Sequence, residues 1–232
     1  MTELHDQTPL ANHRARVAEY LCGVTFPAGS VAARIIAERP AADCAAAPLR
    51  PSLVLWACAA GGGNIADAVP VAAAFDLFDR FLLLHEELAD DEGPAIARWG
   101  LGQSLNAGDA LYALAFRTLC AAVVDPARRV ETARLVAEAV LGAIAERDPV
   151  ARESVLTAAA LGAGAAIAGL SGDAARAFER AGRALAAAAF AEDPAVAQRE
   201  AERAVALLAP WTTAGDAAIF KRVARNVARR AA

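Results

Sequence analysis

The sequence predicts an all-α fold, a compact bundle of about ten helices. Alanine, the strongest helix former, supplies more than a quarter of the 232 residues, whereas aromatic residues make up only 6%. Residues that favour strands are scarce, and no segment alternates apolar and polar side chains as a half-buried strand does. With 57% hydrophobic residues and a formal net charge of −4, the chain is too apolar to be disordered.

Helix boundaries are marked by turn and capping residues. Three Asp-Pro pairs mark helix starts, namely Asp125-Pro126, Asp148-Pro149 and Asp193-Pro194. The aspartate caps the N–H groups of the first turn, and proline suits the first helical position. Ser30 and Asn64 are similar caps, and Gly93-Pro94 predicts a helix end, with glycine in the left-handed conformation. Together these marks predict helices over residues 10–22, 30–39, 50–60, 65–92, 99–122, 126–146, 150–170, 173–191, 195–209 and 214–230.

We expect a cytoplasmic protein without a membrane span. The N-terminus carries acids where a signal peptide needs positive charge, and residues 1–9 are expected to form a flexible tail. His5 and His13 are interpreted as tail residues. The least charged stretch, residues 155–172, is mostly Ala and Gly and is too weakly apolar to cross a bilayer. The slight net acidity argues against a nucleic-acid partner.

The cysteines indicate a reducing compartment. Cys22, Cys44, Cys58 and Cys120 show no paired short spacing and no neighbouring histidine. Zinc and thioredoxin-like sites are therefore excluded, and we expect reduced, mostly buried thiols.

An acidic cluster ends the apolar helix predicted over residues 65–92. Its five carboxylates are Glu86, Glu87, Asp90, Asp91 and Glu92. Glu86 and Asp90 are four residues apart, as are Glu87 and Asp91, so each pair shares a helix face. One interpretation is a solvated helix end. However, the helix dipole disfavours carboxylates there by roughly 0.3–1 kcal/mol each. A Mg²⁺ ion with diphosphate oxygens would reverse that penalty, which favours a diphosphate site above an apolar pocket.

Five stretches of the chain carry a family resemblance. They are Leu49-Arg50-Pro51, Phe75 to Asp91 with His85-Glu86-Glu87-Leu-Ala-Asp90, Gly100 to Phe116, Arg152 to Gly169, and Gly182-Arg183-Ala-Leu. In this order they resemble segments of the trans-isoprenyl diphosphate synthases, the polyprenyl synthetase family. The second resembles that family's first aspartate-rich motif, H-D-D-x-x-D. The third is similar to its G-x-x-x-A-I-N-A-G-D-x-L helix and is the most specific.

The resemblance implies a fold, a cofactor and partners. The fold would be a single domain over residues 1–232, an isoprenoid-synthase-type bundle around a central apolar cavity with Mg²⁺ and diphosphate at its mouth. The substrate would be an allylic prenyl diphosphate. The chain would form a homodimer, or a heterodimer with a related synthase.

The resemblance also assigns site residues, although it assigns no catalytic residue beyond the metal and diphosphate ligands. The predicted metal ligands are Glu86, Glu87, Asp90 and Asp91. The predicted diphosphate-binding residues are Arg50, Arg152 and Arg98. The predicted cavity residues are Phe78, Phe81, Leu82, Gln103 and Asn106; Phe81 would favour a short isoprenoid tail, or is plain core. His85 is expected to be hydrogen-bonded and partly buried rather than a ligand.

Several family positions are altered. Glutamates replace two aspartates at Glu86 and Glu87, and the arginine pair that normally follows is absent, leaving Arg98 as the nearest cation. The lysine that contacts the second, homoallylic diphosphate falls at Ala47. At the second aspartate-rich motif only Glu192-Asp193 is present, and Asp193 has the pattern of a helix cap.

These departures leave two hypotheses of different classes, besides ordinary chain elongation. The leading one is Mg²⁺-dependent ionisation of one allylic diphosphate, followed by terpene-synthase-like cyclisation or elimination. The alternative is a weakly catalytic or non-catalytic subunit that pairs with a competent prenyl diphosphate synthase.

Overall fold

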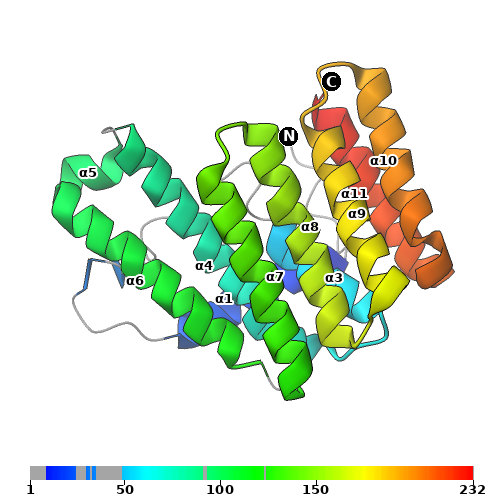
Figure 1. Cartoon of the computed structure of the whole chain (residues 1–232), viewed down its shortest axis with the longest axis horizontal. Helices are drawn as coiled ribbons and strands as arrows, with labels where there is room; N and C mark the ends of the chain where they lie inside the picture. Colours follow the sequence, from blue (N-terminus) through cyan, green and yellow to red (C-terminus); the bar gives the residue numbers. More distant parts are fainter. Residues whose placement is uncertain are drawn as a thin grey trace. The chain divides into compact units, whose positions relative to one another are not determined.

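The computed structural model describes residues 9–24, 30–31, 33–34, 49–90, 93–122 and 124–231. Every regular element in these residues is a helix, so the predicted all-α class is confirmed (Figure 1). The chain divides into two compact units: Met1–Ser52 with Val69–Ala122, and Leu53–Ala68 with Val123–Ala232. We call them the first and the second unit. The single domain over residues 1–232 stays a prediction.

The first unit contains α1 (Pro9–Gly23), the start of α3 (Leu49–Ala60), most of α4 (Ile65–Ala89), α5 (Pro94–Trp99) and α6 (Leu101–Cys120). The expected tail falls largely on residues 1–8, outside the described residues, and α1 begins at Pro9. The interpretation of His13 as a tail residue is wrong, because it lies in α1 and is only 6% exposed. His13 and Val17, one helical turn apart, are both buried.

The segment after α4 differs from the predicted pattern. Gly93-Pro94 was expected only to end a helix, and the next helix was expected to run unbroken from residue 99. Instead Gly93 and Pro94 begin the short helix α5, with proline in its first turn. Gly100, at φ 76°, then separates α5 from α6. Glycine tolerates such a positive φ and therefore breaks the chain into two helices here.

Aromatic side chains join α4 to α6. Phe78 lies edge-on to Phe116, with ring centroids 5.2 Å apart, and Phe81 lies 5.2 Å from Tyr112. Tyr112 and Phe116 are themselves 5.0 Å apart on α6. Edge-to-face and tilted pairs at these distances add about 0.5–1.5 kcal/mol each to simple burial. This aromatic cluster fixes the register of α4 on α6, and so fixes where the acidic end of α4 lies on the first unit.

The second unit contains the end of α3, the start of α4 and the elements that follow residue 123. These are α7 (Pro126–Ala145), α8 (Pro149–Ala168), α9 (Gly172–Ala189), α10 (Pro194–Leu208), the 3₁₀ turn η2 (Ala209–Trp211) and α11 (Ala214–Ala231). Consecutive helices from α7 to α11 pack side by side, and α11 also contacts α9 (Figure 1).

The Asp-Pro caps predicted from the sequence are confirmed. Asp125 accepts hydrogen bonds from Ala127 N and Arg128 N. Asp148 accepts from Val150 N and Ala151 N at the start of α8, and Asp193 accepts from Ala195 N at the start of α10. Ser30 and Asn64 also accept backbone N–H bonds, as expected of caps.

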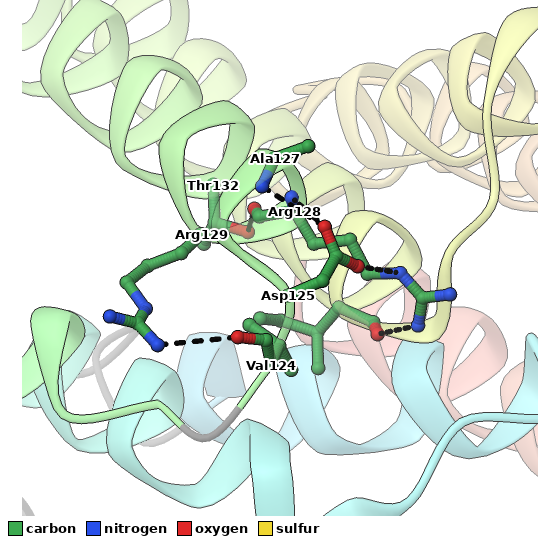
Figure 2. A network of polar contacts seen from close by, with 7 residues as sticks. Val124, Asp125, Ala127, Arg128, Arg129 and Thr132 are labelled. Atoms are coloured by element: carbon green, nitrogen blue, oxygen red, sulfur yellow. Dashed lines mark hydrogen bonds and ion pairs between the residues drawn. The ribbon is translucent and has the colours of Figure 1, made fainter.

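The cap of α7 is part of a larger polar network (Figure 2). The Arg128 guanidinium lies 2.7 Å from the Asp125 carboxylate and also donates to the Ile167 carbonyl at the end of α8. Arg129 donates to the Val124 carbonyl at 3.2 Å. Asp125 and Arg128 together therefore cap α7 and link it to the end of α8.

Helix α8 is the core helix of the second unit. It is the one helix among the described residues that is long and apolar enough to cross a membrane, and 67% of its apolar stretch is buried. Its Gly164 faces the Val54 carbonyl of α3, and a Cβ at Gly182 of α9 would lie 2.6 Å from Ala158 Cα of α8. Such close approach and burial are typical of a core helix in a globular protein.

The described cysteines are all free thiols. Cys58 is buried, and burial raises its pKa to about 11. Cys22 and Cys120 are exposed, so the expectation of mostly buried cysteines is wrong for this part of the chain. Both lie near the last turn of a helix, where the solvent-facing side of the helix carries them. Cys44 lies outside the described residues.

Candidate functional site

Glu86 and Asp90 form the central acid pair at the end of α4. The Asp90 N–H donates to the Glu86 carbonyl at 3.1 Å, so the helical turn continues through both residues. Four-residue spacing in a helical turn puts the two side chains on one side of α4. Glu86 is half-buried and Asp90 is exposed. The pair therefore offers carboxylate oxygens at the solvent-facing end of a helix whose preceding turns are buried.

Glu87, the next predicted metal ligand, is engaged with α5. Its Oε2 accepts a hydrogen bond from Ala95 N at 3.5 Å. A Cβ at Gly93 would lie 2.6 Å from the same oxygen, so the carboxylate is packed against the start of α5. A carboxylate in this position satisfies a free N–H of the first turn. Glu87 thus has a structural partner, which the sequence did not indicate.

The donor set fits a metal site completed by substrate rather than a closed cage. Within the described residues no three His, Cys, Asp or Glu side chains are grouped closely enough to hold a metal ion. Asp91 lies outside the described residues. Two carboxylates on one helix face are nevertheless the type of ligand that Mg²⁺ uses when substrate phosphates and waters supply the rest. Glu86 and Asp90 would hold the ion in such a site.

His85 is packed into the first unit beside the acid pair. Its ring centroid lies 4.4 Å from that of Phe81, and a Cβ at Gly108 of α6 would lie 2.6 Å from His85 Nε2. Burial lowers the pKa of His85, and the charge of Asp109 partly opposes this. Nε2 is buried without a hydrogen-bond partner. The predicted partial burial is confirmed, whereas the expected hydrogen bond is not made at this atom.

The predicted diphosphate-binding arginines lie in three different settings. Arg50 is buried at the start of α3 and donates from Nε to Asp79 Oδ1 at 2.8 Å. Arg98 is exposed on α5, with its guanidinium 4.9 Å from the centre of the Trp99 ring. Arg152 lies in the first turn of α8, in the second unit.

The predicted cavity residues divide by exposure. Phe78, Phe81 and Leu82 are buried on α4, whereas Gln103 and Asn106 are exposed on α6. Sequence reasoning did not assign Tyr112 and Phe116, which complete the aromatic cluster. Their four-residue spacing on the predicted helix was the signal that could have identified them.

Asp193, the one aspartate of the altered second motif, caps α10. Its Oδ1 accepts from Ala195 N at 2.7 Å. This is the cap interpretation made from the Asp-Pro pair, and it gives the carboxylate a structural role.

Sequence comparison finds relatives for part of the chain, although no family model matches. A geranylgeranyl diphosphate synthase of Mycobacterium tuberculosis is 42% identical over 76 residues, 30% of this chain and 22% of that protein. A geranylgeranyl diphosphate synthase of Methanosarcina mazei is 33% identical over 98 residues, 40% of this chain and 30% of that protein. The matches span less than a third of the length of these curated relatives.

Structural comparison covers almost the whole chain. A geranylgeranyl pyrophosphate synthetase from Geoglobus acetivorans superposes with a TM-score of 0.82 at 16% identity, covering 95% of this chain and 97% of that chain. The geranyl diphosphate synthase small subunit of Antirrhinum majus gives 0.73 at 17% identity, covering 94% and 99%. A Caulobacter crescentus polyprenyl synthase complexed with calcium and isoprenyl diphosphate gives 0.73 at 19%, covering 96% of each chain. At these identities the likeness is one of fold.

Proposed function

Because the chain belongs to the trans-isoprenyl diphosphate synthase family, we propose that it acts in isoprenoid biosynthesis on an allylic prenyl diphosphate. The family resemblance predicted from the sequence is confirmed by the partial sequence matches together with the shared fold. The relatives are named as prenyl diphosphate synthases.

The acid pair carries the proposal. Glu86 and Asp90 stand one helical turn apart at the end of α4, above the buried residues Phe81 and Leu82. Carboxylates above apolar side chains suit a substrate that joins a diphosphate to a hydrocarbon tail. The aromatic cluster lies on the preceding turns of α4 and on α6, and would favour a short tail.

The chemistry begins with ionisation of the allylic diphosphate. The bond between the allylic carbon and the diphosphate oxygen breaks, and its electron pair departs on the diphosphate. Mg²⁺ held by Glu86 and Asp90 would stabilise that departing charge as a Lewis acid, and a polyprenyl synthase of the same fold is complexed with calcium and isoprenyl diphosphate. The buried aromatic rings exclude water from the cation.

We assign the cation an intramolecular fate. In cyclisation a double bond of the same molecule attacks the cation, and a carbon next to the new cationic centre then loses a proton to the departed diphosphate. In elimination a carbon next to the allylic cation loses that proton directly. The products are a cyclic or acyclic hydrocarbon and protonated diphosphate. Prenyl transfer needs a second diphosphate held close by. Ala47 stands where the family has a lysine for that group, and Arg50 is bound to Asp79.

We further propose that the protein is cytoplasmic and that it forms a dimer.

A second candidate is a subunit that modifies a competent synthase. The engagement of Glu87 with α5 favours it, because one of the family's acid positions is thereby used for structure. A chain of the same fold is named a geranyl diphosphate synthase small subunit. In this alternative the chain forms a heterodimer and its own acid pair need not turn over substrate.

Product analysis separates these functions. Purified protein is incubated with C10, C15 and C20 allylic diphosphates, with and without Mg²⁺ and isopentenyl diphosphate. We expect hydrocarbon from one allylic substrate alone, dependent on Mg²⁺. A longer prenyl diphosphate formed only with isopentenyl diphosphate would instead assign chain elongation.

The acid pair supplies the control. E86Q/D90N replaces both carboxylates by amides of the same shape and is expected to abolish turnover. Unchanged turnover would contradict the metal assignment. No turnover by the wild type, together with tight binding to a companion synthase, would assign the subunit role.

A further inference from the structure

The strongest unassigned feature is the buried ion pair between Arg50 and Asp79. Arg50 is 6% exposed and Asp79 is 5% exposed. The Arg50 Nε and Nη2 atoms both contact Asp79 Oδ1, at 2.8 and 2.5 Å. Charges this deeply buried must be paired, because desolvation of an unpaired charge costs several kcal/mol.

The position of Asp79 relates the pair to the acid site. Asp79 precedes Glu86 by seven residues within α4. Seven residues fall about 20° short of two full turns and rise about 10 Å, so both side chains lie on the same face of the helix. The guanidinium of Arg50 is therefore held on the acid-bearing face of α4, about two turns below the proposed diphosphate site.

Arg50 lies in a segment that the family resemblance assigns to diphosphate binding. A guanidinium binds a carboxylate and a phosphate with the same donor geometry. In this chain the Nε and Nη2 donors of Arg50 contact a carboxylate of the chain itself, that of Asp79. The neighbouring lysine position is Ala47, so the segment carries no replacement cation there.

We propose that Asp79 is a specificity-determining residue that occupies Arg50 as an internal counter-ion and so excludes the diphosphate of a second, homoallylic substrate. This inference rests on the proposed function, because it takes the acid-bearing face of α4 to be a diphosphate site. The ion pair between Arg50 and Asp79 would explain why a chain with this fold uses one diphosphate substrate rather than two.

The test measures binding of inorganic pyrophosphate and of isopentenyl diphosphate to the full chain, without metal and without allylic substrate. D79N keeps the shape of the side chain and removes its charge. We expect it to bind pyrophosphate about tenfold more tightly than the wild type, since a charge-assisted contact to Arg50 is released. Adding R50Q to D79N is expected to remove the gain.

Asp76 provides the matched control. It is equally buried on α4 and pairs with Arg80 four residues away, at 2.6 Å. D76N should leave pyrophosphate affinity at the wild-type value. A gain in D76N equal to that in D79N would overturn the proposal, because any lost buried carboxylate would then suffice.

The proposal can still be tested if D79N fails to fold. If D79N does not fold, D79S is used, because its hydroxyl still accepts from Arg50 and leaves room for phosphate. A folded variant that binds pyrophosphate no more tightly than the wild type overturns the proposal. So does micromolar binding of isopentenyl diphosphate to the wild type. Failure of the proposed function appears separately, as absence of Mg²⁺-dependent binding of geranyl diphosphate.

Discussion

Gly182 of α9, which packs on α8, and Gly108 of α6, which packs beside the end of α4, make similarly close contacts. The atoms that they contact differ, and so do the consequences. A Cβ at Gly182 would lie 2.6 Å from Ala158 Cα and from the Thr157 carbonyl oxygen. A Cβ at Gly108 would lie equally close to His85, but to its ring. Backbone atoms of a packed helix cannot move aside, whereas a side chain can rotate. The contact at Gly182 therefore affects mainly the stability of the fold. The contact at Gly108 determines where the His85 ring lies beside the candidate site.

The largest expected effect is that of G182A. The added methyl group meets the backbone of α8, and we expect the free energy of unfolding to fall by about 2–3 kcal/mol. Denaturant unfolding followed by circular dichroism measures this.

Gly142 of α7 is the control for that variant. The nearest atom to a Cβ there is Val155 Cγ2 at 3.7 Å, an ordinary contact. G142A should be neutral or stabilise the protein by up to about 1 kcal/mol through helix propensity. If G182A and G142A unfold at the same denaturant concentration, that result would contradict the close packing of α9 on α8 at Gly182.

A smaller effect is expected for G108A, because the His85 ring can rotate away. We expect a loss of about 1 kcal/mol and a rise in the pKa of His85 toward its ordinary value as the ring gains solvent. NMR titration of the imidazole measures the pKa. G102A on the same helix, where a Cβ would meet nothing within 4 Å, should change neither quantity.

Substitution of Glu87 tests whether its carboxylate has a structural role at the end of α4. E87A removes the acceptor for Ala95 N, and we expect a loss of about 0.5–1 kcal/mol with faster hydrogen exchange at that amide. E86A, one residue earlier, should leave exchange at Ala95 unchanged. Equal acceleration in both variants would show that Glu87 does not cap α5.

The smallest effect is a pH dependence from His13. Burial lowers its pKa from 6.5, with the Ser52 backbone opposing and the charge of Arg16 assisting. The unfolded chain takes up a proton near pH 6.5, whereas the folded chain does so only at lower pH. Stability is therefore full above pH 6.5 and falls as the pH drops below it.

H13Q should flatten this dependence in unfolding curves measured between about pH 7 and 5. His85, whose pKa is also lowered, contributes to the slope that remains. An unchanged slope in H13Q would contradict the burial of His13 in α1.

Much of the fold was predictable because local chemistry marks it. Asp125, Asp148 and Asp193 each precede proline, and each caps the helix that was expected there. The break at Gly100 was missed, because glycine within an alanine-rich helical pattern does not reveal its φ angle. The burial of His13 was missed because the residue was assigned to the N-terminal tail, although the helix predicted over residues 10–22 contains it and places Val17 one turn later.

The candidate site was predictable only in part. The pairing of Glu86 with Asp90 follows from four-residue spacing. The contact between Arg50 and Asp79 spans 29 residues, and no helical periodicity reports a contact between different helices. The capping role of Glu87 depends on the path of the chain through Gly93, which the sequence suggests only as a helix end.

The most direct test of the acid pair is Mg²⁺-dependent binding of geranyl diphosphate, measured by calorimetry. The control variant E131Q/E138Q removes two exposed carboxylates of α7, which pair with Arg134 at the surface and contribute little to stability. We expect the wild type and this control to bind with equal affinity, only with Mg²⁺, and E86Q/D90N to bind about 100-fold more weakly. Equal affinity in all three proteins would contradict a diphosphate site at the end of α4.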